Sequence, residues 1–213
     1  MNQASSKKMK LHWSPRSPYV RKVMIFAHET GLSDEFDKVR SVVAMSKPNL
    51  DVMRDNPLGK IPTLVLGDGL ALFGSVVICE YLDSLHRGTK LFPASGRDRW
   101  RALRWHALGD GMLDTLILWR NERDKPTARQ TPEWLAAFEL KIRNSLDVIE
   151  KEVDELARAQ FGIGHIGIAS ALGYLDFRFA DVAWRTGRAR ATRWFEGMAN
   201  RPSMQLTLPS AGE

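Results

Sequence analysis

Hydrophobic and polar positions repeat with two different periods along the chain, and the change falls near residue 88. Before it, short apolar runs bounded by turn residues predict strands, and apolar positions three or four apart predict helices. Gly67-Asp68-Gly69 is a hairpin turn, and Ser75 is expected to cap the helix that follows the hairpin. The expected order is strand, helix, strand, hairpin and helix, at residues 10–13, 18–30, 37–43, 61–66 with 70–73, and 76–85.

Beyond residue 88 the apolar residues keep helical spacing and strand signals are almost absent. Apolar faces predict helices over 105–119, from Thr131-Pro132 to about Leu156, over 164–185 and over 192–200. This contrast predicts two domains. Their expected bounds are 9–88 for the mixed α/β domain and 96–208 for the all-helical domain, with a flexible tail over 1–8 and a linker over 89–95.

Composition narrows the class of protein. Of 213 residues, 44% are apolar and 26% are charged, which excludes a disordered chain and a collagen-like fibre. No apolar run reaches the ~18–20 residues that cross a bilayer, so no membrane association is expected. The opening polar segment lacks the apolar core of a signal peptide, and the one cysteine, Cys79, cannot form an intrachain disulfide. We therefore expect a cytoplasmic protein.

The formal charge of +6 comes from 31 basic and 25 acidic residues, and both signs are mixed in both halves. This mixing favours a solvated helix surface over a polyanion site, so no nucleic-acid partner is expected. The densest basic cluster is Arg178, Arg185, Arg188, Arg190 and Arg193.

The sequence contains no dinucleotide fingerprint, phosphate loop or metal-ligand spacing, and no metal is expected. Three loop features in the first domain could instead form a binding or catalytic site. The segment from Ser14 to Tyr19 joins a strand to a helix N-terminus, where a hydroxyl and free N–H groups can stabilise an anion. The alternative is that Ser17 simply caps the helix, with Pro18 at its first position.

The second feature is Pro62 inside an apolar run, and the third is the junction Phe73-Gly74-Ser75. A cis bond before Pro62 would leave the backbone of Ile61 free to pair with an extended ligand; the alternative is an edge strand that begins after Pro62. The junction offers a second helix N-terminus, which suits a carboxylate.

In this order and spacing, the motifs resemble the glutathione S-transferase family over residues 10–209, and most closely its bacterial members with serine at the thiol position. The resemblance implies a thioredoxin-like N-terminal domain with a mixed four-stranded sheet, an all-helical C-terminal domain and a homodimer. The motifs that carry it are Ser17-Pro18-Tyr19, the stretch from Asn56 to Leu64, Ser75 to Leu82, Ala171 to Arg178, and Asn200-Arg201-Pro202-Ser203.

The resemblance also implies roles for individual residues, with glutathione as co-substrate and a small hydrophobic electrophile as its partner. Ser17 would hydrogen-bond the glutathione sulfur, with Ser14 as the second candidate. Ile61, preceding cis Pro62, would pair its backbone with the cysteinyl part, Lys60 would face the glycine carboxylate, and Ser75, after Gly74, would hold the γ-glutamyl carboxylate. The part of the site that binds the electrophile is expected to be lined by Tyr19, His106, Asp110 and Leu113. The alternative for these residues is packing in the core or at a dimer interface.

The sequence departs from the family pattern at two places. Gly74 stands where the family has Glu or Asp, which binds the γ-glutamyl amine; Asp110 of a second subunit could replace that contact. Gly162 and His165 stand in place of a Ser/Thr-x-x-Asp capping box, which predicts a missing helix cap that costs ~1 kcal/mol, and less with glycine at the cap.

The expected activity is a glutathione transferase, in which Ser17 donates to the glutathione thiolate. Conjugation, dehalogenation, peroxide reduction and double-bond isomerisation all share this thiolate, and the role could be detoxification. Serine at position 17 disfavours disulfide exchange, because serine forms no mixed disulfide. Because Gly74 removes a ligand contact, the alternative is a non-catalytic protein of the same fold that binds a ligand or a partner.

Overall fold

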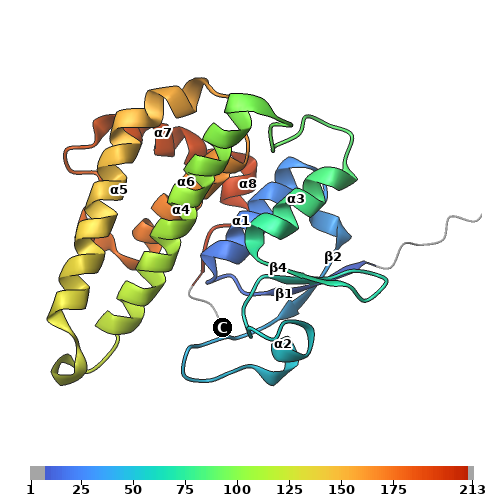
Figure 1. Cartoon of the computed structure of the whole chain (residues 1–213), viewed down its shortest axis with the longest axis horizontal. Coiled ribbons are helices and arrows are strands. Elements are labelled where there is room, and N and C mark those ends of the chain that lie inside the picture. Colours follow the sequence, from blue (N-terminus) through green and yellow to red (C-terminus); the bar gives the residue numbers. More distant parts are fainter. Residues whose placement is uncertain (1–7, 211–213) are drawn as a thin grey trace, which may run out of the picture. The chain divides into compact units, whose positions relative to one another are not determined.

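The structure is a computed structural model that describes residues 8–210, so nearly all of the expected tail lies outside the described residues. The chain divides into two units. One contains the described residues up to Lys90 together with the stretch from Leu206 onward, and the other runs from Leu91 to Gln205. Figure 1 shows the elements of both.

A mixed four-stranded sheet forms the centre of the first unit, in the order β2-β1-β3-β4. Strand β1 (Met9–Trp13) runs parallel to β2 (Phe36–Arg40) and antiparallel to β3 (Thr63–Val65), which pairs with β4 (Ala71–Phe73). Leu11 and Leu64 lie opposite each other on β1 and β3 and are fully buried. The thioredoxin-like sheet that the resemblance implied is thus confirmed.

Three helices accompany this sheet: α1 (Pro18–Glu29), α2 (Leu50–Asp55) and α3 (Ser75–Leu85). Helices α1 and α3 pack against each other, and Figure 1 shows them on one side of the sheet with α2 on the other. Val23 of α1 and Ile78 and Leu82 of α3 are fully buried. The apolar stripe of each helix is therefore what holds it to the sheet.

Several expected boundaries in this unit were wrong. Gly74, not Ser75, is the N-cap of α3, because a φ of 88° turns the chain there and places Ser75 at the first helical position. The strand expected over 37–43 ends at Arg40, and the strand expected over 61–66 spans only Thr63–Val65. Helix α2 was missed; its cap is Asn49, whose side-chain oxygen accepts from the Asp51 and Val52 N–H groups.

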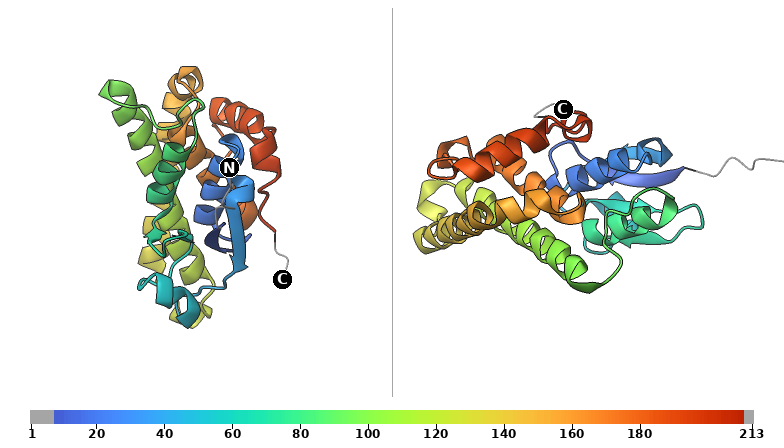
Figure 2. Two further views of the ribbon diagram at one scale, coloured as in Figure 1. Left: turned by 90° about the vertical axis from the view of Figure 1, so that its right-hand side faces the viewer. Right: turned by 90° about the horizontal axis from the view of Figure 1, so that it is seen from above.

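The second unit is helical, as expected, and its helices are α4 (Gly96–Arg123), α5 (Pro132–Arg158), α6 (Ile163–Arg178), α7 (Ala189–Ala199) and α8 (Pro202–Gln205). Helices α4 and α5 lie side by side as two long rods (Figure 2), and α6 packs closely on α4. None of the helices in residues 8–210 is long and apolar enough to span a bilayer.

The contact between α4 and α6 depends on glycine. A Cβ added to Gly109 would lie 2.4 Å from the carbonyl carbon of Gly167, and one added to Gly167 would lie 3.0 Å from the Cα of His106. Backbones that approach this closely leave no room for a methyl group. Gly109 and Gly167 therefore set the distance between the two helices.

At the start of α6 the side-chain cap is missing, as predicted, because Gly162 makes no side-chain cap hydrogen bond, but the return contact of the capping box is present. The His165 ring accepts a hydrogen bond from the Gly162 N–H at Nδ1 (3.3 Å), which is the contact that an N3 carboxylate makes in a capping box. The Leu91 carbonyl accepts from the Ile163 N–H at 2.9 Å. A Cβ on residue 162 would lie 2.3 Å from that carbonyl oxygen, so the family's Ser or Thr cannot fit here.

Two helix bounds in this unit also differ from expectation. The helix expected over 164–185 ends at Arg178, and Ala183 beyond it adopts a left-handed conformation with φ 45°. Helix α7 begins at Ala189 rather than at Thr192. The Glu150 carboxylate accepts from the Arg190 and Ala191 N–H groups, at 3.3 and 2.8 Å, and so caps the earlier start.

Candidate functional site

Ser17 is the N-cap of α1, and its hydroxyl oxygen accepts a hydrogen bond from the Val20 N–H at 3.2 Å. Pro18 occupies the first helical position, so the prediction that Ser17 caps this helix is confirmed. The contact uses the oxygen as acceptor and leaves the hydroxyl proton available. Capping and donation to an anion are therefore compatible in Ser17.

Ser14 is buried three residues before Ser17. Its oxygen accepts from an Arg40 guanidinium nitrogen at 2.7 Å and from the Arg16 N–H at 3.4 Å. The parallel register of β1 and β2 pairs Trp13 with Arg40, which brings the guanidinium beside Ser14. With both lone pairs engaged, the Ser14 hydroxyl is directed to donate.

The turn that leads to Pro62 is held by Asn56, a buried residue. Its amide nitrogen donates to the Lys60 carbonyl and to the Thr63 hydroxyl, both at 3.0 Å. The Ile61–Pro62 peptide bond is cis, and β3 begins only at Thr63. Ile61 and Pro62 are buried, whereas the Lys60 side chain is exposed.

Ser75 is a buried residue at the first position of α3. Its hydroxyl oxygen accepts a 3.0 Å hydrogen bond from Lys22 Nζ, and Lys22 on α1 is itself fully buried. The first N–H groups of α3 have no acceptor within the helix. Ser75 thus joins a hydroxyl, a helix N-terminus and an ammonium group at one point.

Of the four residues expected on the substrate side, Tyr19 lies on α1, with Lys22 Nζ 5.5 Å from its ring centroid. The other three lie on α4, where His106 and Leu113 are buried. His106 Nε2 lies 3.3 Å from an Asp110 carboxylate oxygen, one helical turn away. Tyr19 belongs to the first unit, and the other three residues belong to the second.

A second polar cluster in the first unit centres on His12, which is buried on β1. Its ring nitrogens contact the Ser41 hydroxyl at 2.9 Å and the Asp55 carboxylate at 2.7 Å, and Lys10 Nζ donates to the same carboxylate at 2.6 Å. The hydrogen bond from Lys10, followed by that from His12, lowers the pKa of Asp55. His12 is therefore a satisfied structural histidine.

The chain's metal-binding capacity can be judged from its ligand side chains. Within residues 8–210, no group of three or more His, Cys, Asp or Glu side chains is arranged to hold a metal ion. Cys79 is a buried thiol and is not part of a disulfide.

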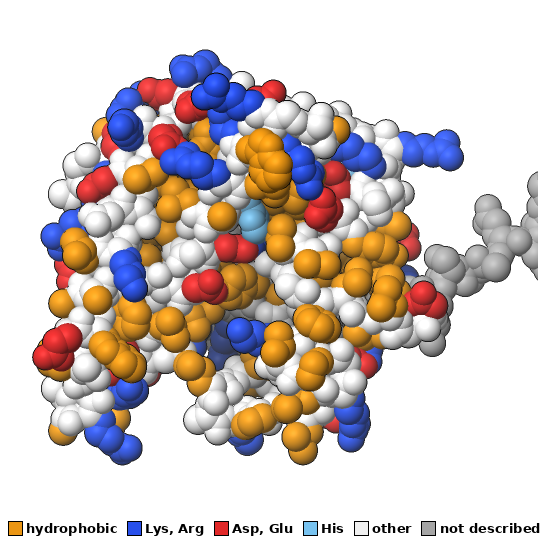
Figure 3. Space-filling model, viewed as in Figure 1, with side chains coloured by type: hydrophobic (Ala, Val, Ile, Leu, Met, Phe, Trp, Pro, Cys, Tyr) orange, Lys and Arg blue, Asp and Glu red, His pale blue; other side chains and the backbone are white. Residues whose placement is uncertain are grey.

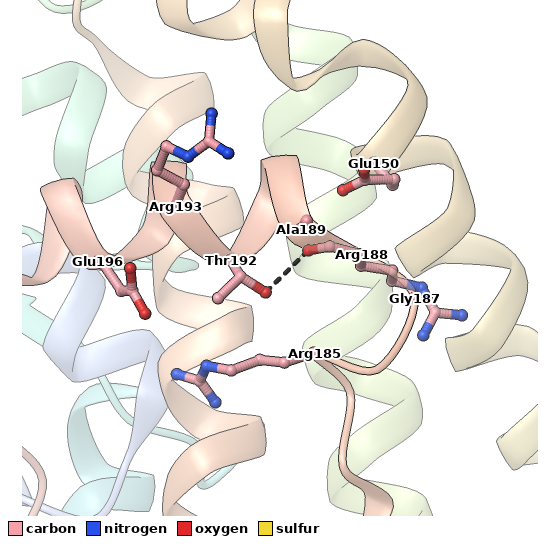
Figure 4. A pocket seen from close by; sticks show the side chains of 8 residues that line it. All are labelled: Glu150, Arg185, Gly187, Arg188, Ala189, Thr192, Arg193 and Glu196. Carbon is pink, nitrogen blue, oxygen red and sulfur yellow. Dashed lines mark hydrogen bonds between the residues drawn. The ribbon is translucent and has the colours of Figure 1, made fainter.

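The basic cluster noted in the sequence contributes three arginines, Arg185, Arg188 and Arg193, to the lining of a surface pocket of about 530 Å³ (Figure 4). Three of its five arginines pair with carboxylates: Arg185 with Asp176, Arg188 with Asp147, and Arg190 with Glu150 and Asp154. Basic and acidic side chains are likewise interspersed over the face in Figure 3. This pairing favours a surface ion-pair network, and we assign the pocket no ligand.

Sequence reasoning missed Lys22 and Arg40. Both are charged residues that reach a predicted site residue from another element, Lys22 from α1 and Arg40 from β2. For Arg40, the parallel pairing of residues 9–13 with 36–40 was the signal that could have found it. For Lys22, the signal was a basic pair, Arg21-Lys22, that interrupts the apolar run from Val20 to Ala27.

With this geometry established, comparison with known proteins defines the class. The family model described as "Glutathione S-transferase, N-terminal domain" matches residues 16–85, and "Glutathione S-transferase, C-terminal domain" matches residues 132–197. The Escherichia coli protein "Uncharacterized GST-like protein YibF" is 33% identical over 205 residues, covering 94% of this chain and 98% of that protein. The chain belongs to the glutathione S-transferase family.

Solved structures give the same result. A glutathione transferase family member from Pseudomonas fluorescens Pf-5, crystallised with bound glutathione, is 41% identical with a TM-score of 0.93, covering 96% of this chain and all of that one. A glutathione S-transferase from Methylobacillus flagellatus, also with glutathione bound, is 31% identical with a TM-score of 0.87, covering 95% and 100% of the two chains.

Proposed function

We propose that this protein is a glutathione transferase that binds glutathione in its first unit and activates the thiol for attack on a small hydrophobic electrophile. The observation that carries the proposal is the 41% identical Pseudomonas structure, which holds glutathione. A second structure of that family member, 40% identical to this chain, holds S-(propanoic acid)-glutathione, in which the glutathione sulfur already carries a substituent. This supports a site that accepts both the thiol and a thioether product.

Glutathione is proposed to lie along the residues that the resemblance indicates. The backbone of Ile61, beside cis Pro62, pairs with the cysteinyl part, and the exposed Lys60 attracts the glycine carboxylate. Ser75, next to Gly74, binds the γ-glutamyl carboxylate. The buried Ser75 hydroxyl and the N-terminus of α3 support this last assignment, since both favour an anion.

The sulfur is proposed to lie near Ser17, with Ser14 as the second candidate donor. A thiol with a pKa of about 8.5 needs about 2.7 kcal/mol of thiolate stabilisation to titrate near pH 6.5. One hydroxyl donor to a charged acceptor contributes about 1.5–3 kcal/mol, and a helix N-terminus adds about 0.3–1 kcal/mol. One correctly placed serine at the start of α1 is therefore sufficient.

In the proposed reaction the thiol proton is released to solvent and the thiolate sulfur forms a bond to an electrophilic carbon. A leaving group departs with its bonding electrons, or, in an addition, the product carbanion takes a proton from water. Neither serine accepts the thiol proton, because a serine hydroxyl is too weak a base; it donates to the anion that remains.

The remaining assignments concern the electrophile and the assembly. Tyr19, His106, Asp110 and Leu113 are proposed to contact the hydrophobic electrophile, and two copies of the chain are proposed to form a homodimer in the cytoplasm, with detoxification as the role. Leu113 is apolar and Tyr19 has an aromatic ring, which suits an apolar substrate.

Gly74 favours one alternative, a protein of this fold that has lost catalysis and retains binding. Titration calorimetry with reduced glutathione at neutral pH, followed by turnover with an activated aryl halide, separates the two. Binding with glutathione-dependent turnover supports the enzyme. Binding without turnover of any tested electrophile supports a non-catalytic glutathione-binding protein. No heat up to ~10 mM glutathione, which corresponds to a binding free energy weaker than about 3 kcal/mol, contradicts the enzyme and favours a protein of this fold that binds another ligand or a protein partner.

A further inference from the structure

Lys22 is fully buried on α1, in a run of otherwise largely apolar residues. Placing an ammonium group in a protein interior is costly unless it is paired with polar groups. One of its hydrogen bonds goes to the Ser75 hydroxyl, 53 residues further along the chain, at 3.0 Å. Lys22 therefore connects α1 to the first residue of α3, where the proposed carboxylate site lies.

This hydrogen bond fixes which way the Ser75 hydroxyl points. An ammonium group has only donors, so the Ser75 oxygen is the acceptor, and its own proton must be directed away from Lys22. The neighbouring N–H groups in the first turn of α3 are donors as well. Ser75 thus presents donors to a ligand, with a positive charge behind them, and this arrangement suits a carboxylate.

Gly74, directly before Ser75, contributes no side chain to this end of the site. A Cβ at this residue would have room, because its nearest neighbour is Val77 Cγ2 at 3.8 Å. The backbone φ of 88° is one that L-residues rarely adopt, and glycine relaxes it. No side chain extends from this position to accept a hydrogen bond from a ligand ammonium group.

We propose that Lys22 is a positioning residue that makes the Ser75 end of the site a receptor for a carboxylate, indifferent to an adjacent amino group. This inference rests on the proposed function and names its substrate class. The protein accepts cysteinylglycine thiols that carry a five-carbon dicarboxylic acid on the cysteine nitrogen. This acid can have the α-amino group, as in glutathione, or lack it.

Calorimetric titration of the full-length protein with three thiols tests the inference: glutathione, glutaryl-cysteinylglycine, which lacks the amino group, and 4-aminobutanoyl-cysteinylglycine, which lacks the carboxylate. We expect the first two to bind within about 3-fold of each other and the third to bind about 10- to 100-fold more weakly. A glutaryl compound that binds tenfold or more weakly than glutathione overturns the inference while the proposed function stands. If glutathione itself fails to bind, both fall.

Two variants assign the effect to residues. Lys22→Met should weaken glutathione and the glutaryl compound equally, by about 5- to 50-fold, and leave the aminobutanoyl compound unchanged. A variant in which all three thiols weaken together would show a merely structural role for Lys22 and contradict the proposal. Gly74→Asp introduces a carboxylate, and should create a preference of about tenfold for glutathione over the glutaryl compound. An unchanged preference would show that residue 74 does not govern amine recognition.

Discussion

The guanidinium group of Arg40 donates a hydrogen bond of 2.7 Å to the hydroxyl oxygen of Ser14. This contact places the positive charge of Arg40 beside Ser14, which is a candidate donor to the glutathione sulfur. A cation close to a thiolate favours the charged form and lowers the thiol pKa. The two residues are 26 positions apart in sequence and are brought together by the parallel pairing of β1 and β2.

Replacing Arg40 with Met should therefore raise the apparent pKa in the pH profile of kcat/KM and lower turnover near neutral pH. Lys38→Met is the matched control, because Lys38 lies on the same strand, with its Nζ 6.0 Å from the Trp13 ring centroid, and carries the same charge. We expect a smaller change in the control. Equal shifts in the two variants would show that general surface charge, not the contact with Ser14, affects the thiol.

Ser17 combines a structural and a proposed chemical role, and two substitutions separate them. Ser17→Ala should lower the free energy of unfolding by about 1 kcal/mol through loss of the cap on α1, whereas Ser17→Gly should lower it by only a few tenths. Both remove the hydroxyl, so both should reduce turnover and raise the kinetic pKa alike. Urea unfolding and pH–rate profiles measure the two effects. If Ser17→Gly keeps the wild-type profile, Ser14 becomes the candidate donor and its Ala variant should show the shift.

The packing of α4 on α6 predicts opposite outcomes for two glycines two positions apart. Gly109→Ala would place a methyl group 2.4 Å from the Gly167 carbonyl carbon, and we expect it to destabilise the protein by about 1–3 kcal/mol or more. At Gly111 a Cβ would meet nothing within 4 Å, so Gly111→Ala should stabilise by up to about 1 kcal/mol. Thermal unfolding of both variants would contradict this account if their midpoints moved in the same direction.

His165 makes stability depend on pH. Burial lowers the pKa of its ring, which accepts from Gly162 at Nδ1 and donates to the Leu156 carbonyl from Nε2 at 2.8 Å. Because the folded pKa lies below the unfolded value of about 6.5, the unfolded chain binds the proton more readily. The stabilisation is fully present above pH ~6.5 and is lost as the pH falls toward and through the folded pKa. Unfolding free energies at about pH 5.5 and 7.5 should differ in that direction, and His165→Asn should reduce the difference; an equal slope in the variant would assign the pH dependence to other groups.

The sequence was most informative where a local signal decides the structure. Ser17-Pro18 and Thr131-Pro132 begin helices because proline at the first turn lacks only an N–H that would have no partner. Hydrophobic periodicity likewise predicted a mixed α/β part followed by a helical part, since burial of an apolar stripe dictates helix and strand faces.

Features that depend on distant residues could not be obtained in this way. Leu91, far away in sequence, approaches residue 162 so closely that a side chain is excluded there, and His165 makes the contact that a capping carboxylate would make. Lys22 and Arg40 reach Ser75 and Ser14 from other elements, so these pairings do not follow from local patterns. The helix expected over 164–185 was predicted too long, because apolar spacing continues across the turn after Arg178, where the helix ends.

The central claim is that this protein binds glutathione and lowers the pKa of its thiol. The direct measurement is the ultraviolet absorbance of the thiolate in the binary complex, titrated against pH under saturating protein. We expect an apparent pKa of about 6.5, about two units below a free thiol, and a return toward about 8.5 in Ser17→Gly. A wild-type complex whose bound thiol titrates like free glutathione would contradict the claim.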